Sequence, residues 1–199
     1  MGRKILIALG ALVAVLVVVI ALQPSTFAVE RSIEIAAPPE VVFSHLESPR
    51  AMDAWSPWVK MDPEQKITHE GPESGVGAIE TWEGPQVGAG RLTITGVEPN
   101  EEVEMRLEFT RPMQATNRAL YTLAMVGDAT RVTWRMEGTN HFIGKAASLV
   151  MNMDEMVGGT FERGLADLKA LAEADAEQRA EHEAAAQAAG GTAPTMTFG

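Results

Sequence analysis

Apolar and polar positions alternate along much of residues 27–138, in short runs separated by turn residues. The clearest run is Val103–Phe109, in which every second residue is apolar and the residues between are charged. A period of two is typical of a strand with one face buried. We therefore predict strands over residues 27–35, 66–69, 78–83, 91–98, 103–109, 116–126 and 130–138. Short connections between the last five favour an antiparallel meander.

A different spacing, with apolar residues three and four apart, predicts one long amphipathic helix over residues 142–173. Such a helix is about 45 Å long and cannot bury its apolar stripe alone, so we expect the sheet to receive it. Gly158 and Gly159 lie midway along it. Each costs about 1 kcal/mol against alanine in a helix, so close packing or a bend is expected there. Prolines predict short helices at residues 40–46 and 49–55.

Residues 5–22 form an uninterrupted apolar run without charge. A helix of this length spans about 27 Å, close to the apolar thickness of a bilayer. Arg3 and Lys4 precede the run, which predicts a cytoplasmic N-terminus and a single-pass anchor with the domain outside the cytoplasm. The alternative is a signal peptide whose cleavage would release a secreted domain.

These patterns divide the chain into three parts. We expect an anchor at residues 1–24, one domain at residues 25–173 and an acidic tail at residues 174–199. The tail is rich in Ala and Glu, which favours a solvated helix followed by a disordered end. The formal net charge of −11 argues against nucleic acid as a partner, because phosphate binding depends on Lys and Arg.

The sequence predicts neither cysteine chemistry nor a metal site. The chain has no cysteine, which excludes disulfides, thiolate ligands and a Cys nucleophile. Its four histidines lie in separate segments without ligand spacing, so no metal site is predicted. No sequence motif indicates a bound cofactor, so none is predicted. The histidines are His45, His69, His141 and His182.

Several motifs resemble those of a known superfamily. They are VERSIEIAAPPEVVFSHL at 29–46, WSPW at 55–58 with DP at 62–63, GVGA at 75–78, TWEG at 81–84, TRVTW at 130–134 and FERGLADLKALAE at 161–173. Together they resemble the SRPBCC or START-like superfamily over residues 27–173, and within it the polyketide cyclase/dehydrase-like proteins. The WSPW…DP, GVGA and WEG motifs look like a membrane-anchored bacterial branch.

The resemblance implies an α+β helix-grip (START/Bet v 1-like) fold. In it a curved antiparallel sheet of about seven strands surrounds a long C-terminal helix, with two short helices after the first strand. It also implies a cavity between sheet and helix for an apolar ligand. It does not imply an enzyme, because lipid carriers, hormone receptors, cyclases and co-chaperone domains share this fold.

Aromatic and methionine side chains would line such a cavity. Methionine adapts to varied ligands, although a well-packed core would use the same residues. We expect Trp55 and Trp58 to belong to a loop that folds over the domain as a lid or plug. The predicted cavity residues are Trp55, Trp58, Trp82, Met105, Phe109, Tyr121, Trp134, Met136, Met153, Met156 and Phe161.

One acidic residue is expected on the inner face of the sheet. If Trp82 points inward, so does Glu80, two residues earlier on the same strand. A buried carboxylate needs a partner or a proton, and Arg31, on the apolar face of its own strand, is a candidate partner. A cyclase would use Glu80 as general base and Tyr121 or Arg31 as donor to an enolate oxygen. A strand-end position, or a contact to the polar end of a ligand, is the simpler interpretation of Glu80.

The sequence patterns and the family resemblance together suggest three alternative functions. The first is a membrane-anchored START-like domain that binds a lipid or other apolar small molecule without covalent chemistry. The second is a cyclase or aromatase type of enzyme that uses Glu80. The third is an interaction module whose cavity is filled.

Overall fold

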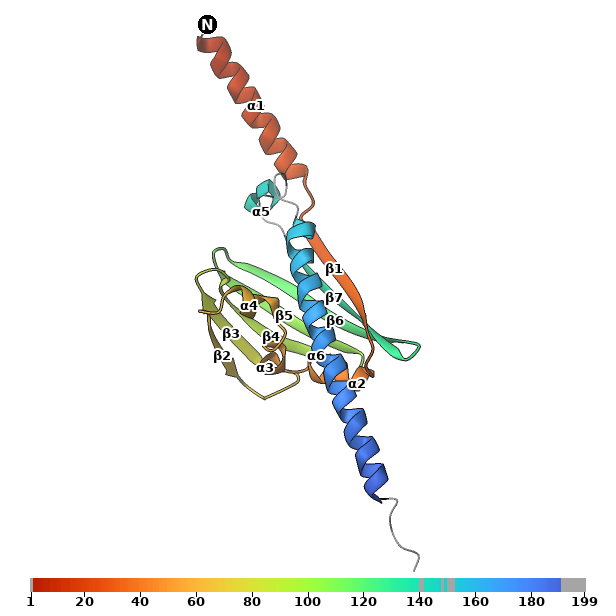
Figure 1. The fold of residues 1–199 in the computed structure, drawn as a ribbon. Coiled ribbons are helices and arrows are strands. Elements are labelled where there is room, and N and C mark those ends of the chain that lie inside the picture. Colours follow the sequence, from red (N-terminus) through yellow and green to blue (C-terminus); the bar gives the residue numbers. More distant parts are fainter. Residues whose placement is uncertain (1, 140–141, 148, 150–152, 191–199) are drawn as a thin grey trace, which may run out of the picture.

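The computed structural model describes residues 2–139, 142–147, 149 and 153–190. It contains one seven-stranded antiparallel sheet with the order β1-β7-β6-β5-β4-β3-β2 (Figure 1). Six successive strands are neighbours and β1 closes against β7, so the predicted meander is confirmed. The strands are β1 (Thr26–Ile35), β2 (Lys66–Glu70), β3 (Ile79–Gly84), β4 (Gly88–Glu98), β5 (Glu102–Arg111), β6 (Ala115–Val126) and β7 (Ala129–Thr139).

The helices differ from the prediction in two places. The second half of the segment 55–58, which was predicted as a lid loop, belongs to a third short helix, α4. This helix begins at Pro57, a position where proline's fixed φ and missing N–H are tolerated. Within the single helix predicted over residues 142–173, the described residues form two helices, α5 and α6, and Leu149 belongs to neither; residues 148 and 150–152 lie outside the described residues. α6 continues past residue 173 into the tail, which was predicted to begin as a helix. The helices are α1 (Gly2–Leu22), α2 (Pro39–Ser44), α3 (Pro49–Met52), α4 (Pro57–Met61), α5 (Phe142–Ala147) and α6 (Met153–Gly190).

The helices α5 and α6 have different packing partners. α5 lies beside the end of α1, whereas α6 runs along the inner side of the sheet over β1 (Figure 1). Lys145 of α5 donates a hydrogen bond to the carbonyl of Ala21, at 3.4 Å between Nζ and O. Periodicity alone does not distinguish two helices with separate partners from one continuous helix.

The buried stripe of α6 forms the centre of the core. Five buried positions at steps of three and four face the sheet, as predicted for an amphipathic helix. Met156 lies just outside this stripe and is 51% exposed, so its predicted place in a cavity wall is wrong. The stripe consists of Val157, Phe161, Leu165, Leu168 and Ala172.

Close packing explains one of the two central glycines of α6. A Cβ atom added at Gly158 would collide with the guanidinium group of Arg31, which lies across the helix at this point. A Cβ at Gly159 would meet no atom within 4 Å. The expectation of close packing at this pair is therefore confirmed at Gly158.

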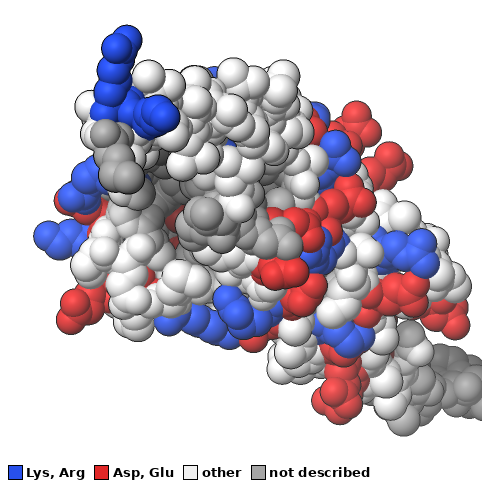
Figure 2. Space-filling view, turned by 90° about the horizontal axis from the view of Figure 1, so that it is seen from above, with Lys and Arg blue, Asp and Glu red and all other residues white. Residues whose placement is uncertain are grey.

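Among the described residues one helix, α1, is long and apolar enough to cross a membrane, and only 6% of its most apolar 18-residue window is buried. Its last residue, Leu22, precedes the first residue of β1, Thr26, by four positions. Viewed from the α1 end, residues other than Lys, Arg, Asp and Glu cover a broad area, and acidic and basic side chains are interspersed around it (Figure 2). An exposed apolar helix is thus joined to the domain by a very short connection.

Candidate functional site

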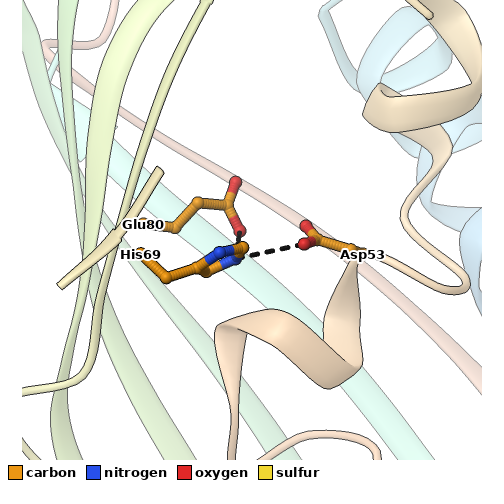
Figure 3. A group of neighbouring side chains, drawn as sticks. All are labelled: Asp53, His69 and Glu80. Carbon is orange, nitrogen blue, oxygen red and sulfur yellow. Dashed lines mark ion pairs between the residues drawn. The ribbon is translucent and has the colours of Figure 1, made fainter. Parts of the chain in front are cut away.

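Three polar side chains converge on the inner side of the sheet edge (Figure 3). His69 on β2 and Glu80 on β3 are directly paired across the two strands. Asp53 reaches them from the C-terminal end of α3. His69 Nε2 lies 3.1 Å from Asp53 Oδ2 and 3.9 Å from Glu80 Oε2. We call these three residues the polar triad.

Burial gives the polar triad unusual electrostatics. Removal from water, followed by the nearby charge of Asp53, raises the pKa of Glu80 to about 8. Burial also raises the pKa of Asp53, although His69 opposes that shift. At neutral pH the site therefore favours a proton, or another positive charge, between the two carboxyl groups.

The inward orientation expected for Glu80 is present, but its expected partner is wrong. Arg31 turns toward α6 instead, where its Nη2 lies 2.9 Å from Asp154 Oδ2 and its Nε lies 2.9 Å from Glu162 Oε1. Arg31 therefore fixes α6 against β1 and does not neutralise Glu80. The reason is geometric, because β1 and β3 are separated by four strands in the sheet.

Tyr121, the other predicted donor, is part of an aromatic core. Its ring centroid lies 5.1 Å from that of Trp134 and 5.9 Å from that of Trp55. Trp134 stacks in turn on Phe161 of α6, with centroids 3.9 Å apart. Burial raises the pKa of the Tyr121 hydroxyl, which keeps it protonated. These four rings bridge the sheet and α6 and fill that part of the space between them.

The remaining predicted cavity residues are distributed over three environments. Met105 and Met136 belong to the same buried core as the aromatic rings. Trp82 is buried against half-buried Phe109, with ring centroids 5.6 Å apart. Trp58 on α4 is 36% exposed and lies at the margin of the domain. Met153 begins α6, and its side chain lies outside the described residues.

Part of the inner sheet face carries apolar side chains that pack against the core but stay half-buried. Strand register places Leu107, Asn117, Gly138 and Phe27 in one row across four strands. Leu107 and Phe27 are only half-buried although they point inward, as is Leu92, the strand partner of both Leu107 and Glu80. Phe109 lies two residues beyond Leu107 on the same face of β5, paired with Gly90 and Ala115. We call Phe27, Leu92, Leu107 and Phe109 the apolar row. It extends from the start of β1, next to α1, toward the polar triad.

The comparisons with known proteins agree with this architecture. The family described as polyketide cyclase / dehydrase and lipid transport matches residues 26–173. That match covers most of the chain, and it includes all seven strands and the polar triad. The protein therefore belongs to the polyketide cyclase / dehydrase and lipid transport family, an SRPBCC-type family, as the sequence motifs predicted. A comparison with curated protein sequences found no match.

Solved structures confirm the helix-grip fold. Norcoclaurine synthase from Thalictrum flavum superimposes with a TM-score of 0.58 at 14% identity, covering 75% of this chain and 96% of that one. The Aha1 dimer from Colwellia psychrerythraea gives 0.54 at 17% identity, with 74% and 96% covered. A protein from Chromobacterium violaceum gives 0.53 at 19% identity, with 75% and 99% covered. At these identities the likeness concerns the fold alone.

Sequence reasoning identified Glu80 but missed Asp53 and His69. His69 could have been found by pairing the two predicted strands across the turn residues Gly71–Gly77, since this pairing sets His69 opposite Glu80. Asp53 gives no such signal. It reaches the site only because the short helices after β1 fold over the edge of the sheet.

Proposed function

We propose that this protein is a membrane-anchored domain that binds a lipid or other apolar small molecule against the inner face of its sheet. The observation that carries the proposal is the position of the apolar row. Phe27, Leu92 and Leu107 pack against the core on one side but stay half-buried, which leaves apolar surface of the kind that lines ligand sites. The row begins at Phe27, five residues after the last residue of α1.

The anchor supports this choice of ligand. A domain joined to a membrane helix by so short a connection stays within a few residues of the bilayer, where lipids and dissolved apolar compounds are concentrated. In this proposal α1 remains uncleaved and Arg3 and Lys4 keep its N-terminus on the cytoplasmic side. The family's description, which includes lipid transport, is compatible with this function.

A photoactivatable lipid tests the proposal. The full-length chain would be placed in nanodiscs containing a diazirine-labelled lipid, illuminated, digested and mapped by mass spectrometry. We expect labelled peptides from β4 and β5 in addition to α1. Leu107→Trp, which fills the row, should reduce the β4 and β5 labelling severalfold without affecting α1. Arg106→Trp, on the outer face of the same strand, is the matched control. Labelling confined to α1 in every variant would refute the proposal.

A second candidate function is acid/base catalysis of the cyclase or dehydrase type by Glu80. The specific observation in its favour is that Glu80 is paired with Leu92 of the apolar row, so a ligand bound there would lie beside its carboxyl group. Glu80→Gln should then abolish turnover of a poly-β-keto test substrate. Glu83→Gln, on the same strand but exposed, should not. Equal turnover by both variants would dismiss the catalytic role.

A further inference from the structure

The polar triad has the composition and spacing of a divalent metal site. One imidazole nitrogen and two carboxylate oxygens, from α3, β2 and β3, all lie within 4.8 Å of one another. Atoms that ligate one ion at about 2.0–2.2 Å are separated by roughly 3–4.3 Å from one another. The 3.1 Å and 3.9 Å separations from His69 Nε2 fall inside that range. Among the described residues this is the one group of three such donors.

The hydrogen bonding of the triad points independently to a missing partner. His69 Nε2 and Asp53 Oδ1 are both fully buried and have no hydrogen-bond partner. His69 Nε2 is close to Asp53 Oδ2, but the two atoms do not have the geometry of a hydrogen bond. The contacts of His69 Nε2 with Asp53 and Glu80 are ion pairs when the imidazole is protonated (Figure 3). With a neutral imidazole the same atoms are placed to bind a shared cation. Buried polar atoms without partners are otherwise costly.

The charge balance of the site leads to the same conclusion. Two carboxyl groups share a poorly hydrated position. Among the described residues neither forms an ion pair with Lys or Arg, although the positive charge of Arg50 acts on Asp53 and lowers its pKa. A divalent cation would balance both charges. An imidazole combined with carboxylates suits Zn²⁺ and neighbouring transition metals better than Ca²⁺ or Mg²⁺, which prefer oxygen ligands alone.

Room for a non-protein ligand exists beside His69. A cavity of about 60 Å³ is bordered by Pro49, Arg50 and the β2–β3 turn, and His69 is the member of the polar triad that lines it. A space of this size holds at least one water molecule. Sites with three protein ligands and an additional water are typical of exchangeable or reactive zinc.

We propose that Asp53, His69 and Glu80 bind one divalent transition-metal ion of the Zn²⁺ class, with a coordination position left open toward the neighbouring cavity. This site does not depend on the apolar row, so its failure would leave the proposed ligand binding untouched. It does compete with the acid/base role of Glu80, because a metal-bound carboxylate stays ionised and does not donate a proton.

Metal binding by the full-length chain in detergent tests the proposal. After chelator treatment and its removal, Zn²⁺ would be titrated calorimetrically, and the metal content would be measured by plasma mass spectrometry after gel filtration. We expect one Zn²⁺ per chain, and we expect Co²⁺ to give a visible absorption band of a site with fewer than six ligands. His69→Ala and Glu80→Gln should each weaken Zn²⁺ binding at least 10- to 100-fold, since even outer-shell changes have effects of that size.

His45 provides the matched control. Like His69 it is a half-buried histidine whose Nε2 has no hydrogen-bond partner, and that atom lies 3.4 Å from Asp175 Oδ2. Among the described residues no third ligand atom completes a group there. His45→Ala should leave the stoichiometry and affinity unchanged. Absence of saturable Zn²⁺ or Co²⁺ binding would overturn the proposal, as would equal binding by the His69 and His45 variants. If the triad variants fail to fold, X-ray absorption of the Co²⁺-loaded wild-type chain decides, because the site requires one imidazole in an otherwise oxygen shell.

Discussion

The two adjacent glycines of α6 allow a controlled test of how the helix is held. Gly159→Ala adds a methyl group into open space, and Gly158→Ala adds one against the Arg31 guanidinium. Both replacements gain about 1 kcal/mol of helix propensity. Only the second must displace Arg31, which is hydrogen-bonded to Asp154 and Glu162. The pair therefore isolates the tertiary contact from the local preference.

The magnitudes follow from the surroundings of Arg31. Each of its ion pairs has an exposed carboxylate partner and contributes roughly 0–1 kcal/mol. Inserting a methyl group into a closely packed contact costs about 1–3 kcal/mol. We expect Gly159→Ala to raise the melting temperature by about 2–4 °C. Gly158→Ala should be less stable than Gly159→Ala by about 1–3 kcal/mol.

Chemical denaturation of the full-length chain in detergent micelles, followed by tryptophan fluorescence, measures this difference. The α1 helix is the same in all variants, so its contribution cancels. In an Arg31→Ala background the obstruction is absent, and both glycine replacements should stabilise equally. Equal effects of the two replacements in the wild-type background would refute the packing argument, as would a difference that persists without Arg31.

Two further predictions concern buried carboxyl groups. Asp62 is fully buried and accepts hydrogen bonds from the backbone N–H groups of Gln86 and Val87. Asp62→Ala should therefore lower the free energy of unfolding by about 1.5–3 kcal/mol in a denaturant titration. Asp62→Asn should be closer to wild type. In metal-free protein the Glu80 pKa of about 8, raised from 4.5, means that folding takes up a proton between these values. The contribution of Glu80 to the free energy of unfolding should therefore be largest below about pH 4.5. It should fall by up to about 1.4 kcal/mol per pH unit as the pH rises toward 8. Glu80→Gln should flatten that slope, and an unchanged slope would show that Glu80 is not the group responsible.

The local patterns anticipated most of the fold. Strict alternation in Val103–Phe109 and its neighbours fixes which side chains face inward, and short connections leave few topologies other than a meander. The apolar spacing of Val157–Ala172 correctly predicted the helix that packs on the sheet. It did not separate α5 from α6, which have different packing partners, α1 and β1.

The candidate site was much less accessible from the sequence. The strand pattern was enough to turn Glu80 inward, since side chains two residues apart share a face. Its neighbours were misjudged, because Arg31 satisfied every local criterion for a partner but lies on a strand at the far side of the sheet. Only the packing of the short helices shows that Asp53 is the second carboxyl group.

What the sequence determined by itself is therefore periodic and local: the strands, the principal helix, the apolar N-terminal helix and the inward direction of Glu80. The tertiary structure alone decided which distant groups meet. It joined Asp53 to the His69–Glu80 strand pair, and it placed Arg31 against Gly158. It also filled the centre with Trp55, Tyr121, Trp134 and Phe161, leaving the apolar row half-covered. The physical reason is that alternation reports the face of an element, whereas the contacts of that face depend on the path of the whole chain.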